Sequence, residues 1–310
     1  MFEHIFILAV SIVLIVRGAT LSTKYAVRLA ESFHLSKFIV GLMVVAVISI
    51  LPETFVAISS SLAGIPEFGL GTLFGSNVAD LTLVFALVIA VSGRGIKIDK
   101  TILKNAAVYP FVFLVPLAMG LNGHFSRMEG VALILLGLVF YYFELRDNKN
   151  NEKAEKHHKE QPYKNALLLL LGMALLLVGS HFTVDSASDL ALLAGISPVL
   201  IGMLIVGIGT TIPELLFSLK AVRNHDGPLA VGDILGTVLA DATIVVGILA
   251  VIAPFEFPQT IIYVTGAFML VASVVLTYFM RSGRVLSKKE GALLLIFWAI
   301  FAITEYLIAN

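Results

Sequence analysis

Two prolines that are each followed at once by a glutamate lie deep inside long apolar runs of the sequence, at Pro52-Glu53 and Pro213-Glu214. Proline has no backbone N–H and pushes away the carbonyl four residues earlier, so each motif frees a main-chain oxygen. A carboxylate at membrane depth costs roughly 2.5 to 3.5 kcal/mol on insertion scales, and by default it marks a functional site with a cationic partner. The two motifs therefore predict cation binding in an apolar environment.

Further polar side chains share helical faces with these glutamates. Ser49 lies four residues before Glu53, and Thr210 lies four residues before Glu214, a spacing that places each pair on one face of a helix. In the apolar runs that follow, the same spacing links two sets of residues: Thr72, Ser76 and Asp80, and Asp233, Thr237 and Asp241. Every side-chain donor is an oxygen, which suits Ca²⁺ and Na⁺ and suits zinc, copper or iron poorly.

Simpler explanations exist for single residues of these types. A lone Ser or Thr in a membrane helix usually bonds back to its own helix, and a lone proline is often only a kink. The glycines in the same runs favour close helix packing over ligand binding. Four acids at corresponding positions in the middle of apolar segments, Glu53, Asp80, Glu214 and Asp241, instead favour a functional cluster.

The composition indicates the environment of these residues. The chain has 310 residues, of which 58% are hydrophobic and 14% charged, which is typical of an integral membrane protein and not of a soluble domain. Basic and acidic residues balance at 21 each, so the net charge favours no nucleic-acid partner. With no cysteine, the sequence excludes disulfides, thiolate metal sites and cysteine nucleophiles. No cofactor and no protein partner is indicated, and the expected partners are transported ions and the lipid bilayer.

Ten segments are apolar and long enough to cross a bilayer, which takes about 20 residues. They cover approximately residues 4–30, 37–62, 68–92, 101–121, 127–146, 163–187, 196–222, 228–253, 257–280 and 288–308. The segment between the fifth and the sixth, at 147–162, is rich in Lys, Glu, Asn and His, which is typical of a solvated linker. The predicted fold is an all-α membrane protein with ten transmembrane helices.

The basic residues indicate the orientation of these spans, because Lys and Arg collect in cytoplasmic loops. Every Lys and Arg except Arg127 flanks the first, third, fifth, seventh or ninth connection. This distribution predicts a multi-pass protein of the cell (plasma) membrane with both termini outside and the central linker in the cytoplasm.

The two halves of the sequence repeat each other at an offset of 161 residues without a gap. The identical pairs include Gly18 and Gly179, Gly41 and Gly202, Pro52-Glu53 and Pro213-Glu214, Gly75 and Gly236, and Ala79-Asp80 and Ala240-Asp241. Because five spans separate equivalent points, the second copy is expected to enter the membrane from the opposite side. We therefore predict a first five-helix repeat at 1–146, a cytoplasmic linker at 147–162 and a second, inverted five-helix repeat at 163–310. Inverted repeats with interrupted helices are typical of secondary transporters that bind their substrate near the midplane.

Two longer motifs resemble a known family. The run Gly-Thr-Thr-Ile-Pro-Glu, followed by Gly-Asp-Ile-Leu-Gly-Thr-x-x-Ala-Asp, is similar to the second alpha-repeat of the cation/calcium exchanger superfamily, and Ile-Ser-Ile-Leu-Pro-Glu with Gly-Ser-Asn-Val-Ala-Asp is similar to the first. The span count, the inverted halves and the central linker also resemble sodium/calcium exchangers of the prokaryotic and archaeal type. The resemblance implies ten helices in two inverted halves and counter-transport of Ca²⁺ against Na⁺ or H⁺.

The same resemblance implies a set of metal ligands. The Ca²⁺ ligands would be the carboxylates of Glu53 and Glu214, with backbone oxygens at Ser49 and Thr210. The ligands of monovalent ions would come from Ala46, Ser76, Asp80, Gly207, Thr211, Thr237 and Asp241.

Two departures from the family pattern bear on the coupling ion. Ile50 stands where such exchangers usually have a hydroxyl and where the second half has Thr211, so one Na⁺ subsite should be weakened or absent. Asp80 and Asp233 each stand where an asparagine is common, and clustered carboxylates cannot all stay ionised unless cations bind. The additional acids favour proton coupling, while the remaining hydroxyls favour Na⁺.

The expected function is a secondary active antiporter that exchanges Ca²⁺ for Na⁺ by alternating access at a midplane acidic site, and the alternative is an exchanger of H⁺ or another cation for Ca²⁺. No enzyme is expected, because the sequence has neither the His-Glu-x-x-His of metalloproteases nor the Gly-x-Gly-Asp of aspartyl intramembrane proteases. A channel is disfavoured by broken helices around a midplane site. The first span of each half, at about 4–30 and 163–187, lacks midspan acids and is expected to move as a gate against the other spans.

Overall fold

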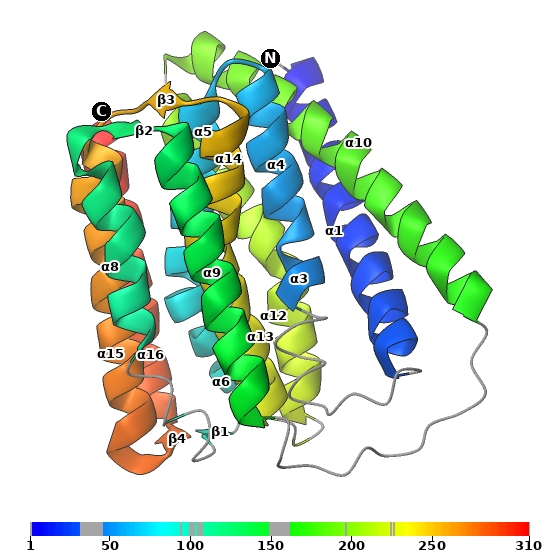
Figure 1. Ribbon diagram of the computed structural model, residues 1–310, viewed down its shortest axis with the longest axis vertical. Coiled ribbons are helices and arrows are strands. Elements are labelled where there is room, and N and C mark those ends of the chain that lie inside the picture. The colour runs from blue at the N-terminus through cyan, green and yellow to red at the C-terminus, as the bar shows by residue number, and fades with distance from the viewer. Residues whose placement is uncertain are drawn as a thin grey trace.

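The computed structural model of the chain is a bundle of long helices that stand side by side (Figure 1). It describes residues 2–31, 46–93, 95–98, 103, 108–148, 162–195, 197–223, 225 and 227–309. Both marked chain ends lie at the upper end of the bundle in this view. In the same view α9 (Arg127–Asn148) ends at the lower end, and α10 (Pro162–Ala194) rises from the lower right.

The helices form two series, one in each half of the chain. The first comprises α1 (Phe2–Glu31), α3 (Ala46–Ser49), α4 (Leu51–Leu62), α5 (Pro66–Ala79), the π-helix η2 (Asp80–Val84), α6 (Phe85–Ser92), α8 (Tyr109–Met119), the 3-10 helix η3 (Gly120–Asn122) and α9. The second comprises α10, α11 (Pro198–Ile201), the π-helix η4 (Gly202–Val206), α12 (Gly207–Arg223), α13 (Gly227–Ala240), the π-helix η5 (Asp241–Val245), α14 (Val246–Ile252), the π-helix η6 (Ile261–Gly266), α15 (Ala267–Gly283) and α16 (Lys288–Ala309).

These helices lie where the sequence predicts the spans. The second, fourth and seventh predicted spans begin in residues that the structure does not describe, and most of the predicted linker lies outside the described residues as well. Within the described ranges, five helical segments are long and apolar enough to cross a membrane, or six if the bent pair Val199–Ile212 and Glu214–Arg223 counts as one. A mainly helical membrane protein is confirmed, and the number of ten spans stays a prediction.

The helix of the first Pro-Glu motif is interrupted, and that of the second is bent. In the first half, α3 ends at Ser49 and α4 begins at Leu51, directly before Pro52. In the second half, the helix bends by 41° between Val199–Ile212 and Glu214–Arg223. A proline cannot donate a hydrogen bond to the carbonyl four residues earlier, which accounts for the interruption at Pro52 and for the bend at Pro213. The predicted interruption is therefore confirmed in the first half, and the second half has a bend in its place.

A π-helix begins at the aspartate of each half. η2 starts at Asp80 and η5 at Asp241, which are equivalent positions of the repeat. Inside these turns the hydroxyls of Thr82 and Thr243, also equivalent positions, donate to main-chain carbonyls four residues earlier. π-Helical turns are rare and are frequent at functional sites. Both halves therefore have a π-helical turn at the equivalent aspartate.

Two short strand pairs join the halves at opposite ends of the bundle. β1 (Ile96–Lys97) pairs antiparallel with β4 (Val285–Leu286), and β2 (His124–Phe125) pairs antiparallel with β3 (Phe255–Glu256). Figure 1 shows β1 and β4 at the lower end and β2 and β3 at the upper end. The prediction of an all-α protein missed these strands, because a run of two residues has no recognisable period.

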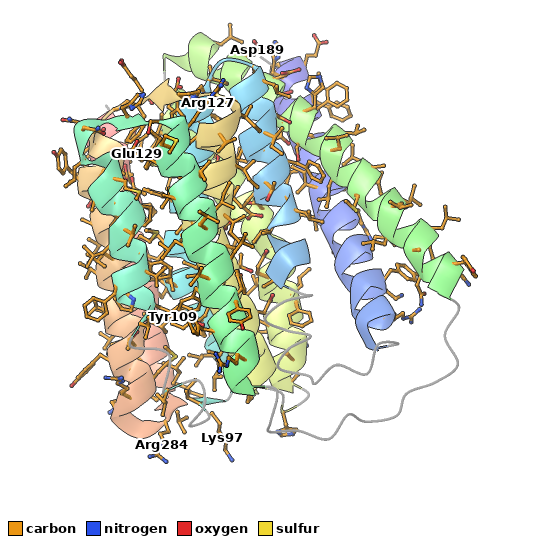
Figure 2. The ribbon with its side chains drawn as sticks, in the orientation of Figure 1. Lys97, Tyr109, Arg127, Glu129, Asp189 and Arg284 are labelled. Atoms are coloured by element: carbon orange, nitrogen blue, oxygen red, sulfur yellow. The ribbon has the colours of Figure 1, made fainter. Side chains whose placement is uncertain are left out.

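Each half begins its last helix with the same capping box, in which a Ser and a Glu exchange hydrogen bonds. At α9, the N–H and hydroxyl of Ser126 donate to Glu129 Oε2 at 2.8 and 2.7 Å. At α16, those of Ser287 donate to Glu290 Oε2 at 2.6 and 2.8 Å. In Figure 2, Glu129 lies at the upper end of the bundle and Arg284, three residues before the second box, at the lower end. Equivalent residues of the halves therefore lie at opposite ends.

The apolar core is divided into two clusters. The larger one fills the bundle around α5, α6, α13 and α14. The smaller one lies between α1, α10 and the helices next to them, and it includes Ile15, Val56, Leu176 and Val206. α1 and α10 lie side by side at the edge of the bundle (Figure 1). This pair therefore packs against the rest of the protein through a small core of its own.

Gly75 in α5 brings the two halves into backbone contact. A Cβ atom at this position would lie 2.6 Å from the carbonyl oxygen of Met203 in η4 and 2.7 Å from its Cα. A side chain larger than hydrogen would push the two helices apart, as is typical of glycines at helix contacts in membranes.

Gly75→Ala is therefore expected to lower the free energy of unfolding by about 1 to 3 kcal/mol, because the added methyl group overlaps backbone that cannot turn aside. Gly283→Ala in α15 is the matched control, since a Cβ there meets no atom within 4 Å. Thermal unfolding of both variants in detergent measures the difference. Equal stability of the two variants would contradict the tight contact.

Candidate cation-binding site

All of the residues that the sequence predicts as metal ligands are buried. They are Ala46, Ser49, Glu53, Ser76, Asp80, Gly207, Thr210, Thr211, Glu214, Thr237 and Asp241. The four carboxylates have no exposed surface. They come from α4, η2, α12 and η5, so each half contributes two of them.

Each half packs one of its helices against the proline break of the other half. α13 packs against α3, and there Ser49 Oγ donates to Asp233 Oδ1 at 3.3 Å. α5 packs in the same way against η4 and α12, where a Cβ on Gly207 would lie 3.1 Å from the backbone N of Ser76. The polar faces of the two halves therefore meet inside the bundle.

Three hydroxyls of the site bond to their own helix. Thr210 Oγ1 and Thr211 Oγ1 both donate to the Gly207 carbonyl, at 3.0 and 2.7 Å. Ser76 Oγ donates to the Leu73 carbonyl at 3.0 Å. This is the simpler arrangement that a hydroxyl in a membrane helix usually adopts. The oxygen lone pairs stay available to a cation, because a hydroxyl can accept while it donates.

The carboxylates have no such partners. Among the described residues, no donor makes a hydrogen bond of good geometry to either oxygen of Glu53, Asp80, Glu214 or Asp241. The Thr210 hydroxyl lies beside Glu53, but its hydrogen bond goes to a main-chain carbonyl. Burial of an unpaired carboxylate costs several kcal/mol even after relaxation of the protein. These side chains therefore require a bound cation or a proton.

The acids also act on one another. Asp80 lies within electrostatic range of Glu53 and Asp233. Asp241 lies within range of Glu53 and Asp80, and Glu214 lies within range of Glu53 and of two aspartates. Like charges in a medium of low dielectric repel strongly, so the five carboxylates cannot all stay charged unless cations neutralise them. They form one electrostatic unit.

The donor set matches a divalent ion held by two carboxylates and several neutral oxygens. In the part of the chain that the structure describes, no three Asp, Glu, His or Cys side chains converge closely enough to hold one metal ion. Ca²⁺ takes six to eight oxygen ligands, so an ion between Glu53 and Glu214 would need neutral oxygens as well. Main-chain carbonyls are available at the breaks, because Pro52 has no N–H to donate to the Ile48 carbonyl.

Asp233 is a site residue that the ligand set predicted from the sequence does not contain. Its side chain is fully buried, its Oδ1 accepts from Ser49, and its Oδ2 has no hydrogen-bond partner among the described residues. The spacing of four residues from Thr237 was a signal for its helical face. Nothing in the sequence showed that this face meets Ser49 in the other half.

Comparison with known proteins identifies a family with the same organisation. The model of a family described as sodium/calcium exchanger protein matches the chain twice, over residues 3–146 and 164–307. The two matches begin and end at the offset of the internal repeat. Each half therefore matches the family model separately.

Individual relatives span nearly the same length. The chain is 30% identical to an uncharacterized membrane protein of Methanocaldococcus jannaschii over 277 residues, which cover 88% of each chain. It is 23% identical to the sodium/calcium exchanger MaX1 of Methanosarcina acetivorans over 97% of this chain and 98% of the relative. Among solved structures, the sodium-calcium exchanger NCX_Mj soaked with Na⁺ and Sr²⁺ superimposes with a TM-score of 0.72 at 26% identity, covering 96% of both chains.

Glu53→Gln and Glu214→Gln are each expected to weaken Ca²⁺ binding by about a hundredfold or more, since loss of one partner of a buried charge pair costs about 3 to 5 kcal/mol. Glutamine keeps the size of the side chain, so thermal stability should stay near that of the unchanged protein. Glu305→Gln is the matched control, because Glu305 is a buried carboxylate that accepts from the Thr265 hydroxyl elsewhere in the bundle. Equilibrium binding of radioactive Ca²⁺ in detergent measures all three. Unchanged binding in either site variant would show that the site lies elsewhere.

Proposed function

Because the chain belongs to the sodium/calcium exchanger family, we propose that it is a secondary antiporter that exchanges Ca²⁺ for Na⁺ by alternating access at the buried acidic site. The observation that carries the proposal is that Glu53 and Glu214, one from each half, lie within electrostatic range of each other as fully buried carboxylates without protein donors among the described residues. A pair of this kind is costly to a membrane protein unless a divalent cation occupies it in part of the transport cycle.

The proposal assigns a role to each ligand. Glu53 and Glu214 neutralise one Ca²⁺, and the backbone oxygens of Ser49 and Thr210 complete its shell. The monovalent ions occupy positions made by the remaining residues: Ala46, Ser76, Asp80, Gly207, Thr211, Thr237 and Asp241. Because these positions share one electrostatic unit with the glutamates, occupancy by several monovalent cations can replace one divalent ion. Exchange then follows from competition for the same negative charge.

The two halves provide the geometry for alternating access. The strand pairs and the capping boxes, which lie at opposite ends of the bundle, support an inverted arrangement of the halves. We infer that the halves are inverted five-helix repeats in a ten-span protein. A site on the axis between inverted halves can be presented to either face of the membrane by related movements, which is the usual mode of such transporters.

The charges at the two ends favour one orientation in the membrane. Figure 2 shows Lys97 and Arg284 at the lower end of the bundle and Arg127 at the upper end. Since basic residues collect on the cytoplasmic side, we infer that the lower end faces the cytoplasm of a cell-membrane protein and that both termini lie outside.

The helices α1 and α10 are the proposed gate. They contact each other along their length, with the Thr183 hydroxyl donating to Ser11 Oγ at 2.8 Å and His4 Nδ1 at 3.2 Å from Asp189 Oδ2. They meet the remaining helices through a separate, smaller core. Such a pair can slide as a unit over the site while the strand pairs hold the rest of the bundle together.

The coupling ion has two candidates. The solved structures with similar folds are of a sodium-calcium exchanger soaked with Na⁺, Ca²⁺ or Sr²⁺, and the hydroxyls of Ser76, Thr210 and Thr211 are the neutral ligands that Na⁺ needs. Ile50 removes one such hydroxyl, and Asp233 adds a carboxylate that could bind H⁺. The balance of these ligands favours Na⁺, with an H⁺/Ca²⁺ exchanger as the second candidate.

Flux in sealed vesicles separates these possibilities. With Na⁺ trapped inside at equal pH, uptake of radioactive Ca²⁺ is expected to rise about tenfold or more over vesicles without a gradient, since one decade of driving concentration is worth about 1.4 kcal/mol for each ion. A pH gradient without Na⁺ is the control and should drive little uptake. Uptake that follows the pH gradient and ignores Na⁺ would replace Na⁺ by H⁺, and uptake that needs no opposing gradient would indicate a channel.

A cysteine crosslink tests the gate. The chain has no native cysteine, and a Cβ on Gly209 would lie 3.4 Å from Ile12 Cγ2, so Ile12→Cys with Gly209→Cys can tie α1 to α12. Oxidation is expected to stop exchange and a reductant to restore it. The matched control, Ser11→Cys with Thr183→Cys, ties α1 to α10 and should leave exchange intact because these helices move together. Exchange that survives the first crosslink would place the gate elsewhere.

A further inference from the structure

Asp233 occupies the point where the second half crosses the proline break of the first half. It lies in α13, which packs against α3, and its Oδ1 accepts from Ser49 Oγ at 3.3 Å. The side chain has no exposed surface. Asp233 is therefore a fifth buried acid of the site, and it makes a hydrogen bond to the opposite half.

One oxygen of this carboxylate is unused. Among the described residues, no group donates a hydrogen bond to Asp233 Oδ2. A packing residue with a single hydroxyl partner would be served as well by a neutral amide, which carries no charge into the core. A carboxylate whose second oxygen is buried and free indicates a cationic ligand that completes its coordination.

The repeat shows that this acid breaks the symmetry of the site. The equivalent residue of the first half is Thr72, whose hydroxyl donates to the Phe68 carbonyl of its own helix at 2.9 Å. A second asymmetry is Ile50, which stands where the other half has the hydroxyl of Thr211. Both differences lie near the proline break of the first half, because Ile50 follows directly in sequence on the serine that bonds Asp233.

We propose that Asp233 holds a monovalent cation, Na⁺ in the exchange reaction, at a subsite beside Ser49 that replaces the hydroxyl missing at Ile50; this assignment rests on the proposed antiport. Ser49 Oγ and the Ile48 carbonyl, which Pro52 leaves without its helical donor, are the neutral oxygens available there. The free oxygen of the Asp233 carboxylate can bind the cation and also carries negative charge, whereas a hydroxyl at position 50 would be a neutral ligand.

Charge balance assigns a monovalent ion to this subsite. Glu53 and Glu214 already offer two negative charges to one divalent ion. Asp233 acts electrostatically on Glu214 and Asp80, so its own charge raises the repulsion inside the unit unless a cation lies beside it. One further monovalent cation neutralises the carboxylate of Asp233. The number of Na⁺ ions exchanged for each Ca²⁺ is then higher by one than in a protein without this subsite.

The test compares Asp233→Asn with the unchanged protein in proteoliposomes. Asparagine keeps the shape and the acceptor for Ser49 but removes the charge. The ratio of ²²Na⁺ to ⁴⁵Ca²⁺ exchanged is expected to fall by about one, the Hill coefficient for Na⁺ to fall, and the half-saturating Na⁺ concentration to rise about tenfold, while Ca²⁺ binding in detergent weakens far less than in Glu53→Gln. An unchanged ratio and Na⁺ response would overturn the proposal, because a purely structural aspartate leaves them as they are.

Glu305→Gln is the matched control, since it neutralises a buried carboxylate outside the site and should leave the ratio unchanged. Loss of Ca²⁺ binding in Asp233→Asn as large as that in Glu53→Gln would also overturn the proposal by making Asp233 a ligand of the divalent ion. If Asp233→Asn does not fold, Ile50→Thr gives a second test in the unchanged background. The returned hydroxyl should lower the half-saturating Na⁺ concentration, and no change there would contradict a subsite at this position.

These outcomes are distinct from failure of the antiport itself. A chain that shows no Ca²⁺ flux under any Na⁺ gradient fails the proposed function before Asp233 is tested. A chain that exchanges Na⁺ for Ca²⁺ with the same ratio in Asp233→Asn keeps the function and loses only this subsite. Flux of the unchanged protein that responds to pH alone would overturn the assignment of Na⁺ to Asp233.

Discussion

The cost of burying five carboxylates in an apolar bundle is the constraint on which the rest of the structure depends. Glu53, Asp80, Glu214, Asp233 and Asp241 are all without exposed surface, and four of them lack any hydrogen-bond donor among the described residues. In a medium of low dielectric, burying such a group of carboxylates costs too much free energy unless cations or protons bind to them. The protein is therefore most stable when it is loaded, and ion binding and folding free energy are linked.

The backbone around the acids is adapted to the same need. Two proline breaks, at Pro52 and Pro213, expose carbonyl oxygens beside the glutamates, and two π-helical turns begin at Asp80 and Asp241. Glycine at position 75 allows helices of opposite halves to touch through their backbones. Each device costs regular helical structure, and each supplies either an oxygen ligand or close approach.

Features that depend on residues close together in the sequence could be predicted, and contacts between distant segments could not. The Pro-Glu breaks followed from the sequence, because a proline lacks its N–H wherever it stands, and the membrane class and the repeat followed from composition and spacing. The strand pairs could not be predicted from the sequence, because a strand of two residues has no recognisable period. The π-helices could not be predicted either, because α- and π-helical turns have the same apolar pattern. The contact of Ser49 with Asp233 depends on how two halves dock, which no local pattern encodes.

The strand pairs have a consequence for biosynthesis. β1 is complete only when β4 has been made, and β2 only when β3 has, so both connections of the first half wait for partners that lie more than a hundred residues later. At the usual rate of about 5 to 20 residues per second, that delay is on the order of 10 to 40 s. At the start of this interval the acids of α4 and η2 are made without the helices of the second half. The early half of the chain is then the form most exposed to quality control.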